Sequence, residues 1–180
     1  MDRGTAIHTG IEHFLQGVAP LPNEALSLAT YYIELKANSP QIEHEWGFTK
    51  DWKFTTWDSS DIWLRMKLDA CVPGNALVRI VDHKTGKYYP IKAIDQGQLY
   101  AVGASIMFPD AEMFKVDFVY VDTGELKTAV YKRSMVDKFK AKFTKRVNQL
   151  MLDKVFTPKP NKFTCRFCQV KDFCQFNVEE

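Results

Sequence analysis

The sequence lacks several features that would place it in a special class of protein. It has no apolar run near the roughly 20 residues needed to cross a bilayer, no internal repeat and no low-complexity linker. Its charged start, Met1-Asp2-Arg3, leads into a helical pattern instead of the apolar core of a signal peptide. These absences argue against a membrane or repeat protein. We therefore expect a cytoplasmic location, which would be the host cytoplasm for a viral protein.

The net charge is also small, but the charged residues are unevenly distributed along the chain. The formal net charge is +2, yet residues 127–180 carry 13 Lys and Arg against 5 Asp and Glu. Residues 1–126 carry the remaining 11 basic against 17 acidic residues. An acidic part followed by a basic part suggests that one binds cations and the other approaches a polyanion. The alternative is that the lysines only form solvated helix faces.

The hydrophobic periodicity predicts an α/β fold. A length of 180 residues fits one domain, so we expect a single domain over 1–180 with a cysteine-containing segment at 155–180. The element order is α-α-β-β-β-α-β-β-α, which predicts a mixed central sheet flanked by helices. Asn23 and Ser134 are the expected N-caps of the second and last helices. The helices are expected at about 3–16, 23–39, 93–108 and 134–152, and the strands at about 42–48, 62–69, 76–84, 113–121 and 127–131.

Two strands end in ionisable residues that could form a catalytic centre. Asp82 and Lys84 are two residues apart near the end of an apolar strand, so their side chains leave the same face. Asp69 ends the preceding strand and joins them if the two strands are neighbours. Two close carboxylates repel unless a cation lies between them, and oxygen ligands suit Mg²⁺ or Mn²⁺. The alternative is that Asp82 and Lys84 are ordinary turn residues.

Four short motifs resemble one family in the order in which they occur. They are Arg3-Gly4-Thr5-Ala6-Ile7-His8, Leu68-Asp69-Ala70, Val81-Asp82-His83-Lys84-Thr85-Gly86-Lys87 and Gln96-Gly97-Gln98-Leu99-Tyr100. Together they resemble the PD-(D/E)xK nuclease superfamily, in particular its RecB-like branch with the CRISPR-associated adaptation nucleases and many phage exonucleases. The resemblance implies a restriction-endonuclease-like core.

The resemblance also implies a role for each matching residue. The metal ligands it implies are His8, Asp69, Asp82 and the carbonyl of His83. Lys84 would be the catalytic base or orient the attacking water, and Gln96 and Tyr100 would position DNA or the lysine.

Several of these positions have simpler interpretations. His8 could be a helix-boundary histidine without function, and Tyr100 could be a core aromatic residue. Glu43 or Glu45 could face the site from the first strand, although an exposed glutamate is an equally good interpretation.

Three of the four cysteines are close together near the C-terminus. Cys165, Cys168 and Cys174 form a C-x2-C-x5-C pattern, which in an intracellular chain favours metal ligation over disulfides. The resemblance implies a [4Fe–4S] cluster, and Zn²⁺ is the other candidate, but a fourth ligand is missing and Cys71 is a poor substitute. A substitute ligand, a longer natural N-terminus and a metal-free remnant all remain open.

The sequence therefore predicts a divalent-metal-dependent DNA nuclease, with exonuclease action on single- or double-stranded ends, in phage or mobile-element DNA recombination or processing. A homo-oligomer or a recombination partner protein is possible on this hypothesis. The basic face of the last helix and residues 159–171 would contact phosphates. A non-catalytic DNA-binding module on the same fold is the main alternative, and a small zinc-binding interaction protein is another.

Overall fold

The computed structural model describes residues 2–155 and 157–178 of the chain. They form two compact units, Met1–Thr144 and Lys145–Glu180. The boundary between the two units lies inside the last long helix. The second unit therefore begins ten residues before the cysteine-containing segment that we expected at 155–180. Residues 1, 156, 179 and 180 of the predicted domain lie outside the described residues, and its unity stays a prediction.

A six-stranded sheet forms the centre of the first unit, in the order β2-β1-β3-β4-β5-β6. The β4–β5 pair is parallel and the other four pairs are antiparallel, so the sheet is mixed. The sequence analysis did not predict β2, because two residues are too few to show an alternation of apolar and polar side chains. The strands are β1 Gln41–Phe48, β2 Phe54–Thr55, β3 Leu64–Val72, β4 Leu77–Lys84, β5 Met113–Tyr120 and β6 Glu125–Lys132.

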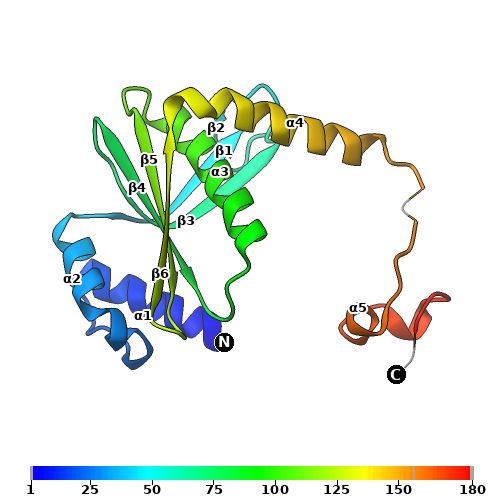
Figure 1. Ribbon diagram of the computed structural model, residues 1–180, viewed down its shortest axis with the longest axis horizontal. Helices are drawn as coiled ribbons and strands as arrows, with labels where there is room; N and C mark the ends of the chain where they lie inside the picture. Colours follow the sequence, from blue (N-terminus) through cyan, green and yellow to red (C-terminus); the bar gives the residue numbers. More distant parts are fainter. Residues whose placement is uncertain (1, 156, 179–180) are drawn as a thin grey trace. The chain divides into compact units, whose positions relative to one another are not determined.

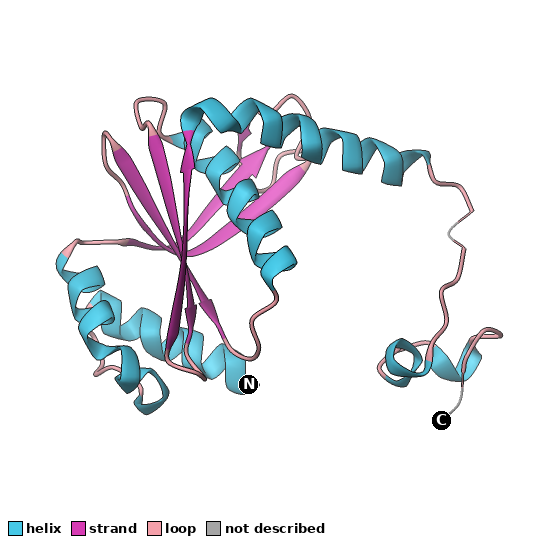
Figure 2. Cartoon of the chain, in the orientation of Figure 1, coloured by secondary structure: helices cyan, strands magenta, loops and turns pink. Residues whose placement is uncertain are grey.

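Helices cover both faces of this sheet (Figures 1 and 2). The helices α1 (Arg3–Gln16) and α2 (Ala29–Ala37) pack on one face of the sheet. They share an apolar core there with side chains of β3, β4 and β5. The opposite face carries α3 (Pro90–Met107) and the first part of α4 (Val136–Leu152), in a second apolar core. The predicted α/β fold with a mixed sheet flanked by helices is therefore confirmed.

Small residues allow α3 to lie close against the sheet. A Cβ on Gly97 would come within 2.6 Å of the Tyr131 hydroxyl oxygen, and one on Gly103 within 2.8 Å of the Met66 sulfur. Either contact is too short for a real Cβ atom, so with a larger residue at either position the side chain of Tyr131 or Met66, or the helix itself, would have to shift. The close approach brings polar side chains of α3 within hydrogen-bonding distance of β4.

Three helix starts differ from the sequence prediction. Asn23 does not cap an α-helix, because a 3₁₀-helix, η1 (Asn23–Leu28), precedes α2. The helix α3 begins earlier than expected, at Pro90, since proline fits the first helical turn, where its missing N–H is not needed. Ser134 does not cap α4 either, because it lies inside the 3₁₀-helix η2 (Arg133–Met135).

The ladder between β1 and β3 is interrupted at one point. Ile42 pairs with Ala70 and His44 pairs with Leu68, but the position between them is skipped, and Glu43 has a positive φ of 52°. Leu68 belongs to the core under α3, whereas Ala70 belongs to the core under α1 and α2. Residues two apart in a regular strand face the same side. The strand therefore changes the face it presents at Asp69.

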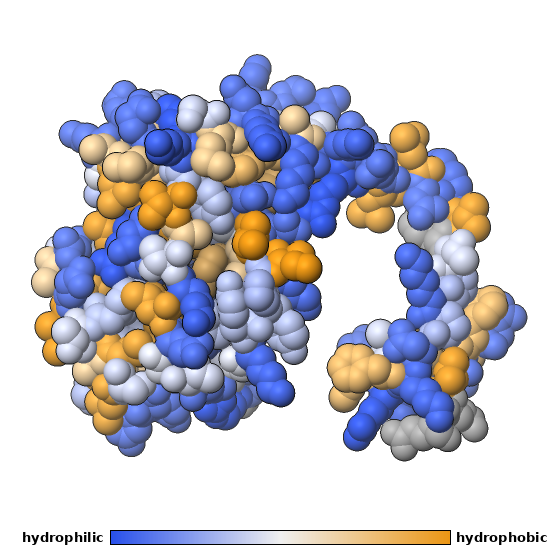
Figure 3. Space-filling view, viewed as in Figure 1, coloured by the Kyte–Doolittle hydropathy of each residue, from blue (hydrophilic) through white to orange (hydrophobic). Residues whose placement is uncertain are grey.

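The second unit contains the end of α4, the short helix α5 (Lys162–Arg166) and the 3₁₀-helix η3 (Lys171–Phe173). Asn161 caps α5, because its side chain accepts a hydrogen bond from the Thr164 N–H at 2.9 Å. Hydrophobic and hydrophilic side chains are interleaved over its surface (Figure 3). Neither here nor elsewhere in the described chain is a helix long and apolar enough to cross a bilayer.

A buried charge network connects α2 to the middle of the sheet. Asp117 on β5 is completely buried, and its Oδ2 accepts hydrogen bonds from Arg79 Nε at 2.7 Å and from the Tyr31 hydroxyl at 3.1 Å. Its Oδ1 accepts a hydrogen bond from the Thr128 hydroxyl at 2.6 Å. Arg79 also pairs with Glu34 on α2 at 3.0 Å. Removing one member of such a network leaves another charge buried without compensation.

The substitution Asp117→Ala should therefore lower the free energy of unfolding by about 3–5 kcal/mol. Urea denaturation followed by tryptophan fluorescence measures this effect in the first unit, which contains all four tryptophans. The matched control is Glu34→Ala, which removes the end of the network that is 63% exposed and should cost about 1 kcal/mol or less. Equal losses in the two variants would contradict the proposed role of the buried carboxylate.

Candidate active site

The polar residues predicted from the sequence lie at one end of two neighbouring strands. Ala70 on β3 pairs with Val81 on β4, so Asp69 and Asp82 occupy the next positions along their strands. Lys84 ends β4, and its Nζ lies 2.6 Å from Asp82 Oδ2. The predicted same-face pairing of Asp82 and Lys84 is confirmed. The two carboxylates are close enough for Asp69 to raise the pKa of Asp82 by charge repulsion.

Asp82 is a buried carboxylate, 6% exposed, and its two oxygens have different hydrogen-bond partners. Its Oδ1 accepts hydrogen bonds from the Tyr100 hydroxyl at 2.7 Å and from Gln96 Nε2 at 3.0 Å. Its Oδ2 is buried and has the Lys84 ammonium beside it, but it accepts no well-aligned hydrogen bond within the described residues. Burial raises the pKa of Asp82, and Lys84 opposes this change.

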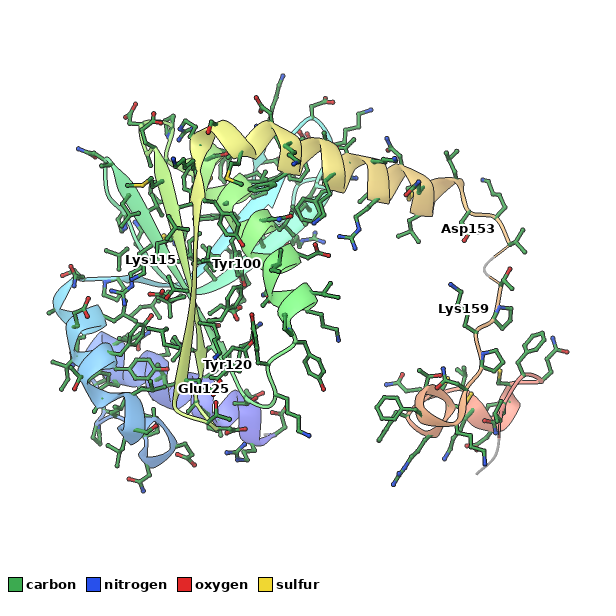
Figure 4. All side chains as sticks on the ribbon, viewed as in Figure 1. Tyr100, Lys115, Tyr120, Glu125, Asp153 and Lys159 are labelled. Carbon is green, nitrogen blue, oxygen red and sulfur yellow. The ribbon has the colours of Figure 1, made fainter. Side chains whose placement is uncertain are left out.

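The helix α3 supplies a side-chain amide that joins the aspartate to the lysine. Gln96 Oε1 accepts a hydrogen bond from Lys84 Nζ at 2.9 Å, and Gln96 Nε2 also donates to the Tyr100 hydroxyl at 2.8 Å. Gln96 and Tyr100 are one helical turn apart and share a face of α3. Tyr100 extends from α3 toward the sheet (Figure 4) and is buried, so it is both a core residue and a partner of Asp82.

Asp69 makes its contacts on the other side of the site. Its Oδ2 accepts a hydrogen bond from the backbone N–H of His83 at 2.6 Å, and its Oδ1 lies 3.3 Å from Nδ1 of His8 on α1. Burial alone would raise the pKa of Asp69, but His8 and His83 together bring it below its usual value. The hydrogen bond with Asp69 raises the pKa of the half-buried His8.

The side chain of His83 is part of the core. Burial lowers its pKa to about 4, so the imidazole is neutral near pH 7. Its Nδ1 lies 3.3 Å from the Tyr32 hydroxyl, and its ring packs edge-on against His8 with the centroids 5.7 Å apart. The ring therefore orients His8. The role of the His83 carbonyl as a metal ligand stays a prediction.

An open pocket of about 500 Å³ lies beside Asp69. Glu43 lines it, while Glu45 is exposed, so the structure selects Glu43 from the two candidates. Glu43 forms an ion pair with Lys67. The sequence analysis missed Glu12, which also lines this pocket. It lies four residues after His8, and that helical spacing could have identified it.

A second contact network joins three distant segments around the loop that follows Lys84. Arg3 forms an ion pair with Asp122 at 2.7 Å, and the backbone N–H of Gly86 donates to Asp122 Oδ2 at 2.9 Å. Gly86 has a φ of 104°, a conformation that residues with a side chain rarely adopt. The turn between β5 and β6 therefore fixes the loop that follows Lys84.

The donor atoms at the main site suit a hard divalent cation. Two carboxylates are ligand types for Mg²⁺ or Mn²⁺, and the buried Asp82 Oδ2 lacks an aligned hydrogen bond in the described residues. Within residues 2–155 and 157–178, however, no three His, Cys, Asp or Glu side chains converge into a ready metal site. Instead, each carboxylate contacts a basic side chain: Asp69 contacts His8, and Asp82 contacts Lys84.

The cysteines do not form the predicted cluster or zinc site. Cys165, Cys168 and Cys174 are free and half-buried in the second unit, and they belong to no metal-binding group in the described part of the chain. Cys71 is buried in the core between the sheet and α3, where desolvation raises the pKa of its thiol. The structure thus gives no support to a [4Fe–4S] cluster or Zn²⁺ at these positions.

The fold and this site define a nuclease-type α/β protein with a restriction-endonuclease-like core. A sequence model of the PD-(D/E)XK nuclease superfamily matches residues 38–175, and the chain belongs to that superfamily. No curated protein sequence matches the chain significantly.

Two solved structures resemble it at low identity. One is a "Putative exonuclease" from Eubacterium rectale, with 11% identity and a TM-score of 0.52, covering 100% of this chain and 77% of that one. The other is SSO0001, with 13% identity and a TM-score of 0.41, covering 85% and 68%. The first similarity supports the fold.

The contact between His8 and Asp69 predicts a pH-dependent contribution to stability in metal-free protein. Because the folded-state pKa of His8 is raised above 6.5, its contribution is present below that pH and is lost as the pH rises through the folded-state value. Without metal, His8→Gln should cost more unfolding free energy at about pH 6 than at about pH 9. Urea titrations in EDTA measure the difference.

The control for this prediction is the same substitution in an Asp69→Asn background. The neutral amide cannot pair with an imidazolium, so the cost of His8→Gln should depend less on pH there. An equal pH dependence in both backgrounds would assign the effect to another partner.

Proposed function

We propose that this protein is a divalent-metal-dependent DNA nuclease that hydrolyses phosphodiester bonds at the Asp69–Asp82–Lys84 site. The observation that carries the proposal is the buried Asp82, whose Oδ2 has no aligned hydrogen bond and lies beside the Lys84 ammonium. Burying a carboxylate is costly unless it is compensated. Lys84, Tyr100 and Gln96 supply part of that compensation, and a bound divalent cation would add to it during function. Membership of a nuclease superfamily supports this interpretation.

The residues that would hold the ion are Asp69, Asp82, His8 and the carbonyl of His83. When bound, Mg²⁺ or Mn²⁺ would stabilise charge on the phosphoryl group and lower the pKa of water. Asp69 is held for this role by the backbone N–H of His83, and Glu43 adds a further carboxylate to the same pocket. The ring of His83 stays neutral and buried beneath this site.

Lys84 would act as the catalytic base, or it would orient the attacking water and stabilise the developing negative charge. Gln96 and Asp82 fix the position of its Nζ, so the ammonium is directed before the substrate arrives. The Tyr100 hydroxyl donates a hydrogen bond to Asp82 Oδ1, so that Oδ2 is the oxygen that contacts Lys84. Such pre-oriented donors stabilise developing charge without a reorganisation cost.

Exonuclease action is the proposed mode. The Eubacterium rectale protein named as a "Putative exonuclease" has the same fold, and the resemblance to phage exonucleases supports a role in phage or mobile-element DNA processing. The basic residues of α4 and of residues 159–171 suit a polyanionic substrate.

Removing the lysine should abolish most of the activity. Lys84→Met should lower kcat by about 10²- to 10³-fold, because it removes a donor directed at developing charge. The matched control is Lys132→Met, at the opposite end of the sheet, where β6 pairs with Met113. Cleavage of labelled DNA is measured with Mg²⁺, with Mn²⁺ and with EDTA. Undiminished cleavage by Lys84→Met would refute the active-site assignment.

Asp82→Asn should abolish metal-dependent cleavage while retaining the fold, because the amide keeps the shape of the side chain but loses its charge. Asp110→Asn, in the exposed turn after α3, is the control and should cleave normally. If the unsubstituted protein binds DNA but never cleaves it with either metal, the non-catalytic DNA-binding alternative replaces the proposal.

Exonuclease action predicts a dependence on free ends. In a time course, end-labelled linear DNA should release mononucleotides or short products, while covalently closed circular DNA stays intact under the same conditions. Nicking the circle first should make it a substrate if a single-strand break provides an end. Rapid cleavage of the closed circle would instead establish endonuclease action.

A further inference from the structure

A second pocket, of about 410 Å³, opens on the other side of the lysine. Its volume is within the range of about 300–1,000 Å³ that is typical of small-ligand sites. It shares Lys84 and Gln96 with the proposed active site, whereas the first pocket shares Asp69 and His8. The active site is therefore bordered by two pockets with different linings.

The charges of the two pockets are opposite. The first pocket contains the carboxylates of Glu12, Glu43 and Asp69. The second contains three ammonium groups and no carboxylate, from Lys84, Lys87 and Lys92. Lys87 and Lys92 are exposed, and neither forms an ion pair with a carboxylate in the described residues. A recess with several cations and no anion is suited to phosphate groups.

An aromatic ring lies at the same pocket. Tyr89 lines it and is 57% exposed, and the Lys92 Nζ is 5.2 Å from the centroid of its ring. Tyr120 lines the pocket as well but is buried, at the sheet end near Glu125 (Figure 4). An exposed ring beside lysines is the combination by which proteins bind unpaired bases, since the ring stacks on the base while the cations contact the backbone.

Contacts within the protein restrain part of the pocket wall. The Gly86 N–H donates to Asp122, which Arg3 holds in turn. Tyr88 packs edge-on against Tyr120, with the ring centroids 5.4 Å apart. A ligand that enters this pocket therefore pays little to order the loop, which favours binding.

We propose that this pocket binds an unpaired nucleotide of single-stranded DNA next to the phosphate that is cleaved. Tyr89 stacks on the base, while Lys87 and Lys92 contact the flanking backbone phosphates. The proposal rests on the proposed nuclease function and adds the substrate class, because a base inside a duplex has both faces covered by its neighbours and cannot stack on Tyr89. A single strand, or the frayed end of a duplex, is thus the preferred substrate.

Binding without metal tests this pocket separately from cleavage. Fluorescence anisotropy in EDTA is measured with a labelled single strand of about 12 nucleotides and with a blunt duplex of the same length. Tyr89→Ala should weaken single-strand binding by about 5- to 150-fold, which corresponds to the loss of one stacked base. Tyr89→Phe keeps the ring and should bind within about 2-fold of the unsubstituted protein.

The lysines are tested by the salt dependence of the same binding. Replacing both Lys87 and Lys92 by Ala removes two phosphate contacts and should reduce the slope of log K against log salt by about 1.4. Lys132→Ala, at the far end of the sheet, is the control and should leave the slope unchanged. Circular dichroism and the thermal midpoint verify that each exposed-site variant is folded.

The outcomes separate the two proposals. Equal losses of single-strand and duplex binding in Tyr89→Ala, or no loss in either, overturn the pocket assignment even if the protein is a nuclease. So does an unsubstituted protein that binds no single strand in EDTA. If single-strand binding depends on Tyr89 but no metal supports cleavage, the nuclease proposal fails and the binding pocket stands.

Discussion

The burial of the Asp82 carboxylate is the constraint on which the rest of the site depends. A carboxylate that is 6% exposed requires partners. One of them, Lys84, comes from its own strand, and the others come from α3. Tyr100 and Gln96 reach it from α3, where Gly97 leaves room for the Tyr131 side chain. The packing of α3 on the sheet therefore supplies two of the hydrogen bonds that Asp82 accepts.

The order of the longer strands and helices could be predicted from the sequence, because apolar periodicity indicates it. The two-residue strand β2 and the five-residue helix α5 were missed, since each is too short to show a period. The pairing of Asp82 with Lys84 could be predicted too, since it needs only the two-residue period of a strand. Helix starts were wrong where local backbone chemistry decides them. Asn23 begins a 3₁₀-helix, and α3 begins at Pro90, a few residues earlier than its apolar period indicates.

Other parts of the site could not be predicted because long-range contacts determine them. The change of face at Asp69 follows from the skipped pair beside Glu43, and nothing in the alternation of β3 announces it. The contact of Arg3 with Asp122 joins residues 119 positions apart. The cysteine spacing suggested a metal site that the described residues do not form, since spacing gives proximity along the chain but no fourth ligand.

The role of Asp122 has a consequence for how this fold can vary. The turn between β5 and β6 is a surface turn, the kind of segment that usually tolerates insertions. Here its aspartate also sets the backbone of Gly86 and, through it, the wall beside Lys84. Lengthening the turn would therefore change the position of Gly86, which is distant in sequence but lines the pocket beside Lys84. In engineering terms, the hairpin turn is a place to change the shape of that pocket while Asp69, Asp82 and Lys84 keep their own contacts.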